Sequence, residues 1–591
     1  MAAPRTATSG AATGPESAGA RDGQTVRFPH TTPPDEVAVL VVGAGPVGLA
    51  AAVELAGREV AVTVVDAATS ATLVRAGAMG HTPRTVEHFR RWGVLQPIRQ
   101  AWTFPPEWNR GIRVVTSLVG HELVDRQRRG FTEPGVLRHS LAAPIRRPQT
   151  VLQQVFLDHL AVRGVPVAGG WRVTELREVD DAVLTTVVSV ATGETRVIRS
   201  AYVIGADGGS STVRRLAGIA RQGEYADEKM VRLVVRTAAG FDAAGAAPSG
   251  TNIVVNQRAY GFLAAISSRQ WRVYAGPYPL DAEPPEEELL ATARAAFGLD
   301  LDLELSSSTT FYHATRIAET FRRGRVLLAG DAAHVRTPGG NLGEGFGDVV
   351  NLGWKLAAVL AGHGPDALLD SYDQERRPHN WRVADHALDR ARRGKERLAE
   401  IRRIGVPDDL DHSPAAQARR DEIRALLAAE HGEAPGVLFD ERYDASGVLW
   451  YDQNQLTEET PWHPDRYEDD PRPGHRAPDG YVDPWGDTLY DRIGNAFGLL
   501  VFGGGREVER AFVAEAGGRG LPFTVVHLTD EPARRLYGAD HVLVRPDQHV
   551  AWRGGQLPPA GAGAVLDRVL GHAAPTTTVA TKGVPHVHAV R

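Results

Sequence analysis

The sequence contains no cysteine in its 591 residues. Disulfide bonds, thiolate nucleophiles, thiolate metal sites and redox-active cysteine pairs are therefore all excluded. Two histidines near the end of the chain, His586 and His588, have no third ligand beside them, so we predict no metal site. Any redox chemistry on this chain would have to be supplied by a bound cofactor.

The sequence is also short of positive charge and of long apolar runs. Lysine and arginine together number 66 against 72 aspartates and glutamates, which leaves a net charge of -6. That balance argues against a nucleic-acid partner, because phosphates bind to a basic surface, and it gives no support for a membrane partner. The longest apolar runs, such as residues 37–42, fall far below the ~18 residues that a membrane span needs. We expect neither a nucleic acid nor a membrane among the partners.

In other respects the composition is that of a globular protein. Hydrophobic residues make up 42% and charged residues 23% of the chain, so most of it should fold. At ~150 residues per domain, the length corresponds to about four domain-sized units. Residues 1–36 differ, because they are rich in Ala, Thr, Gly, Ser and Pro and lack the apolar core of a signal peptide. We predict that they form a disordered tail on a cytoplasmic protein.

A dinucleotide-binding fingerprint follows the first apolar strand. Gly43 permits a tight turn, Gly45 lets the backbone approach a pyrophosphate, and Gly48 lets the next helix pack closely on the strand. Pro46 lies within the same loop. Asp66 ends the following strand, where an acidic side chain accepts hydrogen bonds from ribose hydroxyls and repels a 2′-phosphate. The site is therefore predicted to prefer FAD or NAD over NADP.

Two further motifs lie where apolar strands end. Asp207-Gly208 follows one strand and leads through Ser211 into a helix. Gly330-Asp331 follows another strand. Each motif has a purely structural alternative, which is a capped Asp-Gly turn for the first and a common Gly-Asp step for the second. Neither motif indicates a binding site by itself, and they become informative only together with the fingerprint.

The pattern between and after these motifs indicates how the chain is organised. Alternating apolar stretches on both sides of the second motif predict mixed strands, and these would form a substrate-binding part interleaved with the nucleotide-binding body. A charged helical stretch spans roughly residues 371–430, and a region rich in Pro and Asp at 460–484 marks a boundary. Beyond it, apolar strands alternate with a helix near residues 507–516. This end of the chain is predicted to be a separate small α/β domain.

The three motifs at these separations, with Arg75-Ala76 after the first, resemble the class A FAD-dependent flavoprotein monooxygenases. Segments 473–478, 543–547 and 550–553 resemble the C-terminal domain of the aromatic polyketide hydroxylase branch, whose substrates are of the anthracycline, angucycline and tetracenomycin type. The resemblance implies an α/β fold in which a p-hydroxybenzoate hydroxylase-like, Rossmann-like FAD-binding domain is interleaved with a mixed β-sheet substrate domain, followed by a thioredoxin-like α/β domain. The implied division is a FAD-binding domain at 37–110, 139–220 and 313–400, a substrate domain at 111–138 and 221–312, a helical linker region at 401–470 and the thioredoxin-like domain at 471–591.

The same resemblance assigns cofactor contacts. The fingerprint and Asp66 hold the AMP half of FAD, the second motif serves the pyrophosphate and nicotinamide binding, and the third holds ribityl or ribose hydroxyls. The loop near residue 340, which is about two residues shorter than the family pattern, lies against the flavin ring. The helix that begins around Gly343 directs its positive end at the flavin and stabilises negative charge there. The predicted cofactor-binding residues are Gly43, Gly45, Pro46, Gly48, Asp66, Arg75, Gln149, Asp207, Gly208, Gly330, Asp331, Pro338, Gly340, Leu342 and Gly343.

The resemblance further implies a monooxygenase. NADPH or NADH would reduce a non-covalent FAD, O2 would add, and the flavin hydroperoxide would hydroxylate a polycyclic aromatic, phenolic substrate of the polyketide type. A Baeyer-Villiger or other oxidative rearrangement on the same scaffold stays open, as does a non-catalytic FAD-binding protein. A flavin-dependent halogenase would need a Trp-x-Trp-x-Ile-Pro signature that the sequence lacks. We expect a monomer or a homodimer.

No catalytic base can be assigned from the sequence. His334, just after the third motif, is better explained by packing and hydrogen bonding than by catalysis. Several residues of the predicted substrate region could orient a phenolate, although each is better explained as part of a sheet surface. These residues are Tyr225, Arg258, Tyr260, Arg272, Tyr274 and His313.

Overall fold

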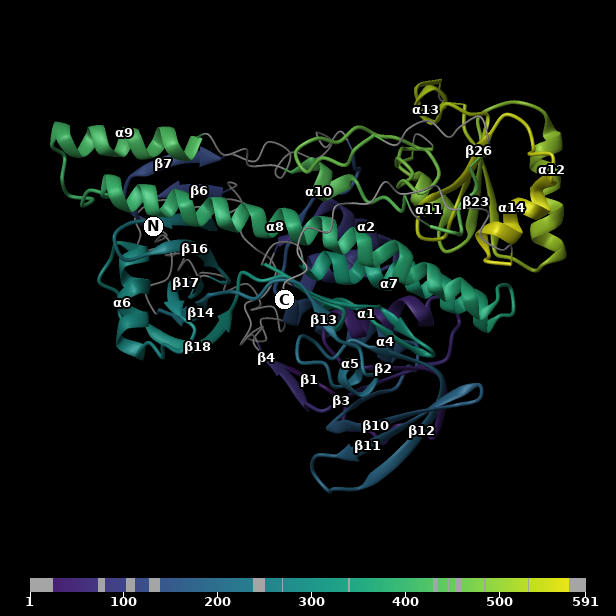
Figure 1. Cartoon of the computed structure of the whole chain (residues 1–591), viewed down its shortest axis with the longest axis horizontal. Coiled ribbons are helices and arrows are strands. Elements are labelled where there is room, and N and C mark those ends of the chain that lie inside the picture. The colour runs from purple at the N-terminus through teal and green to yellow at the C-terminus, as the bar shows by residue number, and fades with distance from the viewer. Residues whose placement is uncertain are drawn as a thin grey trace, which may run out of the picture.

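The computed structural model describes residues 25–72, 80–101, 112–126, 139–237, 250–267, 269–337, 341–428, 434–444, 446–451, 460–482, 485–529 and 531–572. Two large sheets organise most of the chain, and a smaller sheet organises its C-terminal part (Figure 1). No helix within these ranges is long and apolar enough to cross a membrane.

An eight-stranded sheet carries all three sequence motifs. Strand β12 joins its two parts, because its first half pairs antiparallel with β11 while its second half lies parallel between β21 and β2. Residues 39–41 of β2 are fully buried, as expected for an apolar strand covered on both faces. The strands of this sheet are β2 (Glu36–Val42), β3 (Val62–Asp66), β9 (Val167–Gly169), β10 (Trp171–Val179), β11 (Ala182–Ser189), β12 (Thr195–Gly205), β20 (Arg322–Arg323) and β21 (Val326–Leu328).

Helices follow the parallel strands and bring the motifs to one edge. Helix α1 begins directly after the fingerprint turn and packs against both α4 and α7. The short helix α5 begins after the second motif, and a single 3₁₀ turn, η3, forms at the third. Because parallel strands present their carboxyl ends at the same edge of a sheet, the three turns lie together there. These elements are α1 (Pro46–Ala56), α4 (Gln149–Val162), α5 (Thr212–Leu216), η3 (Gly330–Ala332) and α7 (Asn341–Leu360).

A seven-stranded sheet forms the second layer of the body, in the order β18-β14-β17-β16-β15-β6-β7. Helix α6 (Glu286–Phe297) covers one face, where Leu289, Ala293 and Phe297 join a core with residues of β14 and β17. All neighbouring strands are antiparallel except β15 and β6. The strands are β6 (Ile112–Val115), β7 (Glu122–Arg126), β14 (Glu228–Arg236), β15 (Thr251–Val255), β16 (Tyr260–Ala265), β17 (Gln270–Pro279) and β18 (Glu304–Phe311).

Two helices, not one, occupy the charged stretch that follows. Helix α8 (Asp370–Ile404) runs for 35 residues and spans the length of the body (Figure 1). It ends at Gly405, whose φ of 78° breaks the helix, and α9 (Pro414–Ala428) begins after the turn. The predicted charged helical stretch over 371–430 is therefore helical apart from the turn between α8 and α9, where Gly405 takes a conformation that a helix cannot contain.

The prediction of a disordered tail over 1–36 is wrong for residues 25–36. Strand β1 (Thr25–Arg27) pairs antiparallel with β4 (Ser70–Thr72). Val26 and Phe28 are only 3% and 7% exposed, since they join the core of the eight-stranded sheet. Two apolar side chains at strand spacing are enough to anchor this segment, although its polar surroundings conceal them in the sequence.

A four-stranded sheet organises the C-terminal part, in the order β24-β23-β25-β26. Strands β23 and β24 are parallel, whereas β25 and β26 run antiparallel to their neighbours. Helices α12 and α14 pack on each other, and Trp354 of α7 belongs to the same core. The elements are α11 (Leu489–Ile493), β23 (Phe497–Val501), α12 (Arg506–Gly518), β24 (Phe523–His527), α13 (Glu531–Tyr537), β25 (His541–Val544), β26 (Val550–Gly554) and α14 (Gly561–Val569).

A carboxyl group at the junction of the C-terminal part with the body gives the fold a pH dependence. Asp479 accepts backbone amide hydrogen bonds from Gly480 (3.0 Å) and Tyr490 (3.2 Å). Burial raises its pKa to about 7, and Glu87 adds repulsion. A carboxyl whose pKa is raised on folding stabilises the fold most below about pH 4, its unfolded value, and this contribution disappears as pH rises through 7.

We therefore expect Asp479→Asn to become more stable relative to the native protein as the pH is raised from 5 to 8. Urea unfolding of both proteins at several pH values measures the difference. A difference that stays constant over this range would show that Asp479 does not titrate there.

Candidate active site

The fingerprint turn has the geometry that the sequence predicted, and two of its glycines are sterically required. Gly43 has a φ of 112°, and a Cβ on it would lie 2.4 Å from the Ala206 carbonyl oxygen. A Cβ on Gly48 would lie 1.9 Å from the Gly43 carbonyl oxygen. Gly45, by contrast, has no atom within 4 Å of its Cβ position. The turn thus packs tightly against the second motif and leaves open space at Gly45, at the N-terminus of α1.

Asp66 ends β3 beside this turn and holds its shape. One carboxylate oxygen accepts the Ala44 amide at 2.6 Å, and the other accepts the Ala68 amide at 2.7 Å. Burial raises its pKa despite these two hydrogen bonds, and Asp207 contributes repulsion. Each carboxylate oxygen has two lone pairs, so both can accept a further hydrogen bond from a ligand hydroxyl.

The second motif forms the capped turn that was the structural alternative. The Asp207 carboxylate accepts hydrogen bonds from the Ser211 hydroxyl and from the Thr212 and Val213 amides, the latter two at 2.6 and 3.1 Å. Ser211 in turn accepts the Arg214 amide and caps α5. Gly208 has a φ of 80°. The motif therefore builds the wall against which Gly43 packs, and a cofactor contact from Asp207 stays a prediction.

The third motif presents a free carboxylate. Gly330 takes a φ of 60° and lies against Val47 of α1. In the described part of the chain, no group donates a hydrogen bond to the Asp331 carboxylate, whereas its backbone oxygen accepts one from Arg221 at 2.8 Å. A carboxylate without a donor at the carboxyl edge of the sheet suits a ligand hydroxyl.

Helix α7 begins two residues earlier than the sequence predicted, at Asn341. Leu342 is buried in the core, and a Cβ on Gly343 would lie 2.9 Å from the Thr85 hydroxyl oxygen. A Cβ on Gly345 would lie 2.6 Å from Val47 of α1. The first turns of α7 therefore pack on α1 and on α2 (Pro83–Arg91) through glycines. The predicted cofactor residues Arg75, Pro338 and Gly340 lie outside the described residues.

Helix α4 supplies a contact that the sequence analysis missed. Gln149 stands at its first position, where no hydrogen bond identifies a role. Gln153, one turn later, is buried and donates to the Ala44 carbonyl oxygen at 3.0 Å. Gln153 lies four residues after Gln149, so the two side chains share a helix face. This spacing is the sequence feature that could have identified Gln153.

A buried ion network fixes the start of α7. Arg376 of α8 is fully buried and contacts three carboxylates. Its Nε lies 2.9 Å from Asp348, its Nη1 lies 2.5 Å from Glu441, and its Nη2 lies 3.0 Å from Glu344. Glu344 belongs to the first turn of α7, and Glu441 to the segment that leads into the C-terminal part. Arg376 therefore connects the candidate flavin helix with a distant part of the chain.

The same network reaches the third motif. Asp348 accepts the Gly330 amide at 3.0 Å and lies 2.6 Å from Nε2 of His334. Burial alone would raise the pKa of Asp348, but His334 and Arg376 outweigh it and keep the pKa below its usual value. His334 is itself fully buried, which agrees with its assignment to packing and hydrogen bonding.

A second buried group joins α7 and α8 to the C-terminal sheet. Glu375 pairs with Lys355 at 2.6 Å and with Arg545 at 2.6 Å, and none of the three side chains is exposed. Arg545 also pairs with Asp547 and lies over the Trp354 ring, 5.3 Å from its centroid. Burial lowers the pKa of Lys355 to about 8 although Glu375 opposes this effect. The C-terminal part is thus bound to the body by buried charges as well as by apolar packing.

Three arginines gather beside the second and third motifs. They are Arg214 of α5, Arg221 of β13 (Arg221–Gln222) and Arg316 of β19 (Arg316–Ala318). In the described ranges none of them pairs with a carboxylate. Burial and the neighbouring arginines lower the pKa of Arg221 to about 10. Arg316 lies over the Tyr225 ring, 5.7 Å from its centroid, and that tyrosine is 73% exposed. The cluster combines three positive charges, opposed only at longer range by Asp207 and Asp331, with an exposed aromatic face.

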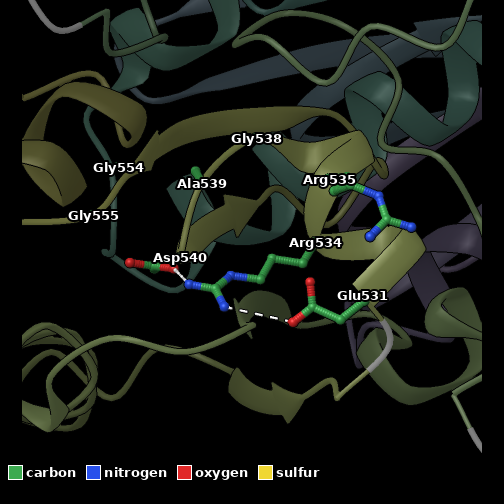
Figure 2. Close-up of a pocket in the computed structure, with 8 residues that line it drawn as sticks. All are labelled: Glu531, Arg534, Arg535, Gly538, Ala539, Asp540, Gly554 and Gly555. Carbon is green, nitrogen blue, oxygen red and sulfur yellow. Dashed lines mark hydrogen bonds and ion pairs between the residues drawn. The ribbon is translucent and has the colours of Figure 1, made fainter.

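A cavity lies away from these motifs, in the C-terminal part. It has a volume of about 430 Å³ and lies between α13 and the loops around Asp540 and Gly555 (Figure 2). Figure 2 shows the Arg534 side chain between Asp540 and Glu531, with which it pairs at 2.7 and 3.7 Å. Arg535 also lines the cavity, so its wall holds two cations and two carboxylates and offers no distinct ligand chemistry.

The residues at the carboxyl edge of the eight-stranded sheet fit FAD. The glycine turn leaves space for a pyrophosphate at the N-terminus of α1, Asp66 has lone pairs for ribose hydroxyls, and Asp331 has a carboxylate without a donor. Together they suit an extended dinucleotide.

Comparison with known proteins agrees with this geometry. Residues 36–387 match the family described as an FAD binding domain, and residues 470–573 match the C-terminal family of the aromatic-ring hydroxylases. A putative polyketide hydroxylase of Streptomyces halstedii is 32% identical over 554 residues, which cover 89% of this chain and 94% of that protein.

Solved structures show the same fold. The rebeccamycin biosynthetic enzyme RebC with reduced flavin has a TM-score of 0.77 at 29% identity and covers 92% of this chain and 100% of its own. The ternary complex of aklavinone-11 hydroxylase with FAD and aklavinone has a TM-score of 0.74 at 27% identity, with 91% and 100% coverage. The chain therefore belongs to the class A flavin monooxygenases, in the group of the aromatic-ring hydroxylases.

Proposed function

We propose that this protein hydroxylates a polycyclic aromatic substrate of the polyketide type, with FAD as cofactor, O2 as oxidant and NADPH or NADH as electron donor. The observation that carries the proposal is the cradle at the sheet edge, which combines the sterically required glycines with the Asp331 carboxylate, to which no group in the described ranges donates. The names of its relatives support the substrate class, since they include polyketide hydroxylases and an aklavinone hydroxylase.

The chain supplies binding, orientation and electrostatics in this reaction. Bound FAD supplies the electron transfer and the oxygen activation. Asp331 would accept a hydrogen bond from a hydroxyl of the cofactor chain, and Gly45 would let the backbone approach its pyrophosphate. The amides at the N-terminus of α7 would stabilise negative charge on the flavin ring. Glu344 and Asp348 hold that helix in place through Arg376.

The three-arginine cluster supports binding of a reduced nicotinamide dinucleotide. Arg214, Arg221 and Arg316 would neutralise its phosphates, and the exposed ring of Tyr225 would stack on one of its bases. The cluster adjoins Asp331 through the hydrogen bond from Arg221, so the donor would approach the flavin from that side. The reaction would take place in the cytoplasm, where NADPH and NADH are available as electron donors.

The C-terminal part supports a thioredoxin-like assignment. Its order β24-β23-β25-β26, with one parallel pair followed by two antiparallel strands and α14 last, is the order expected for that fold. Because the chain has no cysteine, such a domain would serve structure and not thiol exchange. The buried contacts of Arg545 support that structural role.

The direct test uses the purified full-length protein. We expect a flavin absorbance spectrum, oxidation of NADPH or NADH that accelerates with an aromatic substrate, and incorporation of one atom from 18O2 into the product. A protein that takes up no FAD on reconstitution would contradict the proposal. A product that carries the labelled oxygen in a new lactone ring would identify the Baeyer-Villiger alternative.

Removing the charge of Asp331 should weaken FAD binding. We expect Asp331→Asn to raise the FAD dissociation constant about tenfold, because a hydrogen bond to a charged group contributes about 1.5 kcal/mol or more. Equilibrium titration of the apoprotein, followed by flavin fluorescence, measures this constant. Asp370→Asn is the matched control, since Asp370 is an exposed carboxylate that pairs with Arg322 at 2.8 Å. Equal affinities in both variants would remove Asp331 from the site.

A further inference from the structure

The two faces of the seven-stranded sheet differ in chemistry. Val231, Leu233 and Val273 point toward α6 and form an apolar core with it. Side chains alternate along a strand, so Arg232 and Tyr274 point to the opposite face. Helix α6 lies on the outer side of the sheet, and the opposite face looks toward the FAD-binding body (Figure 1).

On this inner face two arginines flank one phenol ring. Arg232 of β14 stands directly opposite Tyr274 of β17 in the strand register. The Cζ atom of Arg232 lies 5.7 Å from the centroid of the Tyr274 ring, and Cζ of Arg272 lies 5.5 Å from it. Phe311 lies 5.2 Å from Arg232, and Phe262 lies 6.0 Å from Arg272. We call this set of five residues the inner aromatic face.

The positive charge of Arg232 is not neutralised by any carboxylate in the described part of the chain. Its Nε is buried and donates a hydrogen bond to no protein group there. The side chain as a whole is only partly buried, so a ligand can still reach it. A guanidinium held in an aromatic surrounding loses hydration, and this loss is offset fully only when an anion binds.

The positive charges of the two arginines also change the pKa of the tyrosine between them. Burial would raise the pKa of Tyr274, but Arg272 and Arg232 outweigh burial and lower it. The pKa of Arg272 is itself lowered by burial and by the charge of Arg232. The same two positive charges would stabilise the oxygen anion of a ligand that reached this face.

We propose that the inner aromatic face recognises a substrate with a negative charge, namely a planar aromatic molecule carrying a carboxylate or an ionised phenol oxygen. Arg232 binds the anionic oxygen, and the rings of Phe262, Tyr274 and Phe311 contact the planar ring system. The inference rests on the proposed function and adds to it a requirement for charge. It assigns a specificity role to Arg232, which the sequence analysis did not single out.

This face is distinct from the three-arginine cluster. Arg221 and Arg316 belong to a separate three-stranded sheet with β22 (His334–Val335), and they adjoin the cofactor motifs. Arg232 lies in the seven-stranded sheet, between β17 and β18. The two positive sites can therefore bind the electron donor and the substrate separately.

Binding measurements on the FAD-loaded, full-length protein test the proposal. The probes are 1-hydroxy-2-naphthoate and its methyl ester, which differ in charge and scarcely in shape, and 4-nitro-1-naphthol, whose ionisation is visible in its absorbance. Naphthoate fluorescence reports binding. We expect the carboxylate to bind about tenfold or more tightly than the ester, or the bound nitronaphthol to ionise at lower pH than the free compound. The first result would identify a carboxylate substrate, and the second an ionised phenol.

Variants then locate the effect. Arg232→Gln should remove the preference for the anion, and Arg232→Lys should retain part of it. Arg113→Gln is the matched control, because Arg113 lies in β6 of the same sheet and pairs with Glu122 at 2.7 Å. Equal binding of acid and ester by the native protein, together with an unshifted nitronaphthol, would overturn the proposal, as would an unchanged preference in Arg232→Gln. The comparison of ligands on the native protein needs no variant to fold.

Failure of this inference is distinguishable from failure of the proposed function. Flavin absorbance and flavin reduction by NADPH or NADH report on the proposed function and do not depend on the charge of the probe. A flavin-loaded protein that binds acid and ester equally contradicts only the anion site.

Discussion

Arg376→Met should lower the free energy of unfolding by about 3–5 kcal/mol, the range found when one partner of a buried ion pair is removed. The methionine fills much of the same volume, but Glu344, Asp348 and Glu441 lose the cation that they share. Because Glu344 and Asp348 belong to α7, we also expect weaker retention of FAD. Denaturant unfolding and flavin occupancy after gel filtration measure the two effects.

The pH dependence separates the charge effect from lost packing. Without Arg376 the pKa values of the three carboxylates rise, so the loss of stability should be smaller at pH 5 than at pH 8. Arg377→Met is the control, because this neighbouring arginine is 32% exposed and pairs with Asp373 on its own helix. Such exposed pairs contribute about 1 kcal/mol or less. Similar losses in the two variants would show that the buried network adds nothing to the fold.

Gly48→Ala should prevent the FAD site from forming, whereas Gly45→Ala should leave the fold intact. The Cβ of the first variant would lie 1.9 Å from the Gly43 carbonyl oxygen, which belongs to the backbone and cannot move without opening the turn. We expect a loss of about 3 kcal/mol or more in stability and no bound flavin. The Cβ of the second variant meets no protein atom within 4 Å.

The same pair of variants tests the cofactor assignment. Gly45→Ala should melt at nearly the temperature of the native apoprotein and still bind FAD more weakly, because the methyl group occupies the path of the pyrophosphate. Thermal unfolding of the apoproteins and FAD titration give both values. Native FAD affinity in Gly45→Ala would place the pyrophosphate somewhere other than the start of α1.

The parts of this fold that the sequence predicts are those set by neighbours along the chain. The strand, turn and helix around Gly43 and Gly48 are local, and the steric demand on each glycine arises within a few residues of it or from the adjoining strand end. The interleaving of two sheets also follows from the positions of the motifs. The order of the four C-terminal strands agrees with a small α/β domain, as the alternation of strands and helix indicated.

What the sequence does not predict depends on contacts between distant segments. Arg376 binds carboxylates on α7 and at Glu441, and neither spacing has a helical or strand period. Arg232 and Tyr274 lie opposite each other because of the register between β14 and β17. That register cannot be predicted from the sequence of either strand alone. Sequence spacing identified Tyr274 as one of several polar candidates, and only the pairing of strands shows which arginines lie beside it.

Local chemistry also distinguishes the second motif from the third. The Asp207 carboxylate accepts two amides of the first turn of α5, and its predicted contact with the cofactor stays a prediction. An Asp-Gly sequence before a short helix satisfies the helix amides first, since these donors are always within reach. Among the residues that the structure describes, no helix amide binds the Asp331 carboxylate, which is why the same residue type leaves an open acceptor in the third motif.

The long separation of Glu375 from Arg545 has a consequence for synthesis of the protein on the ribosome. The two residues are 170 positions apart, and their side chains pair in the interior. At about 5–20 residues per second, roughly 10 to 30 s pass between translation of the carboxylate and translation of the arginine. During that interval Glu375 can pair with Lys355, which precedes it in the chain, but it lacks its second cation. The buried network on α7 and α8 is therefore completed only after the C-terminal part has been translated, and a stalled chain lacking that part would be a substrate for chaperones and proteases.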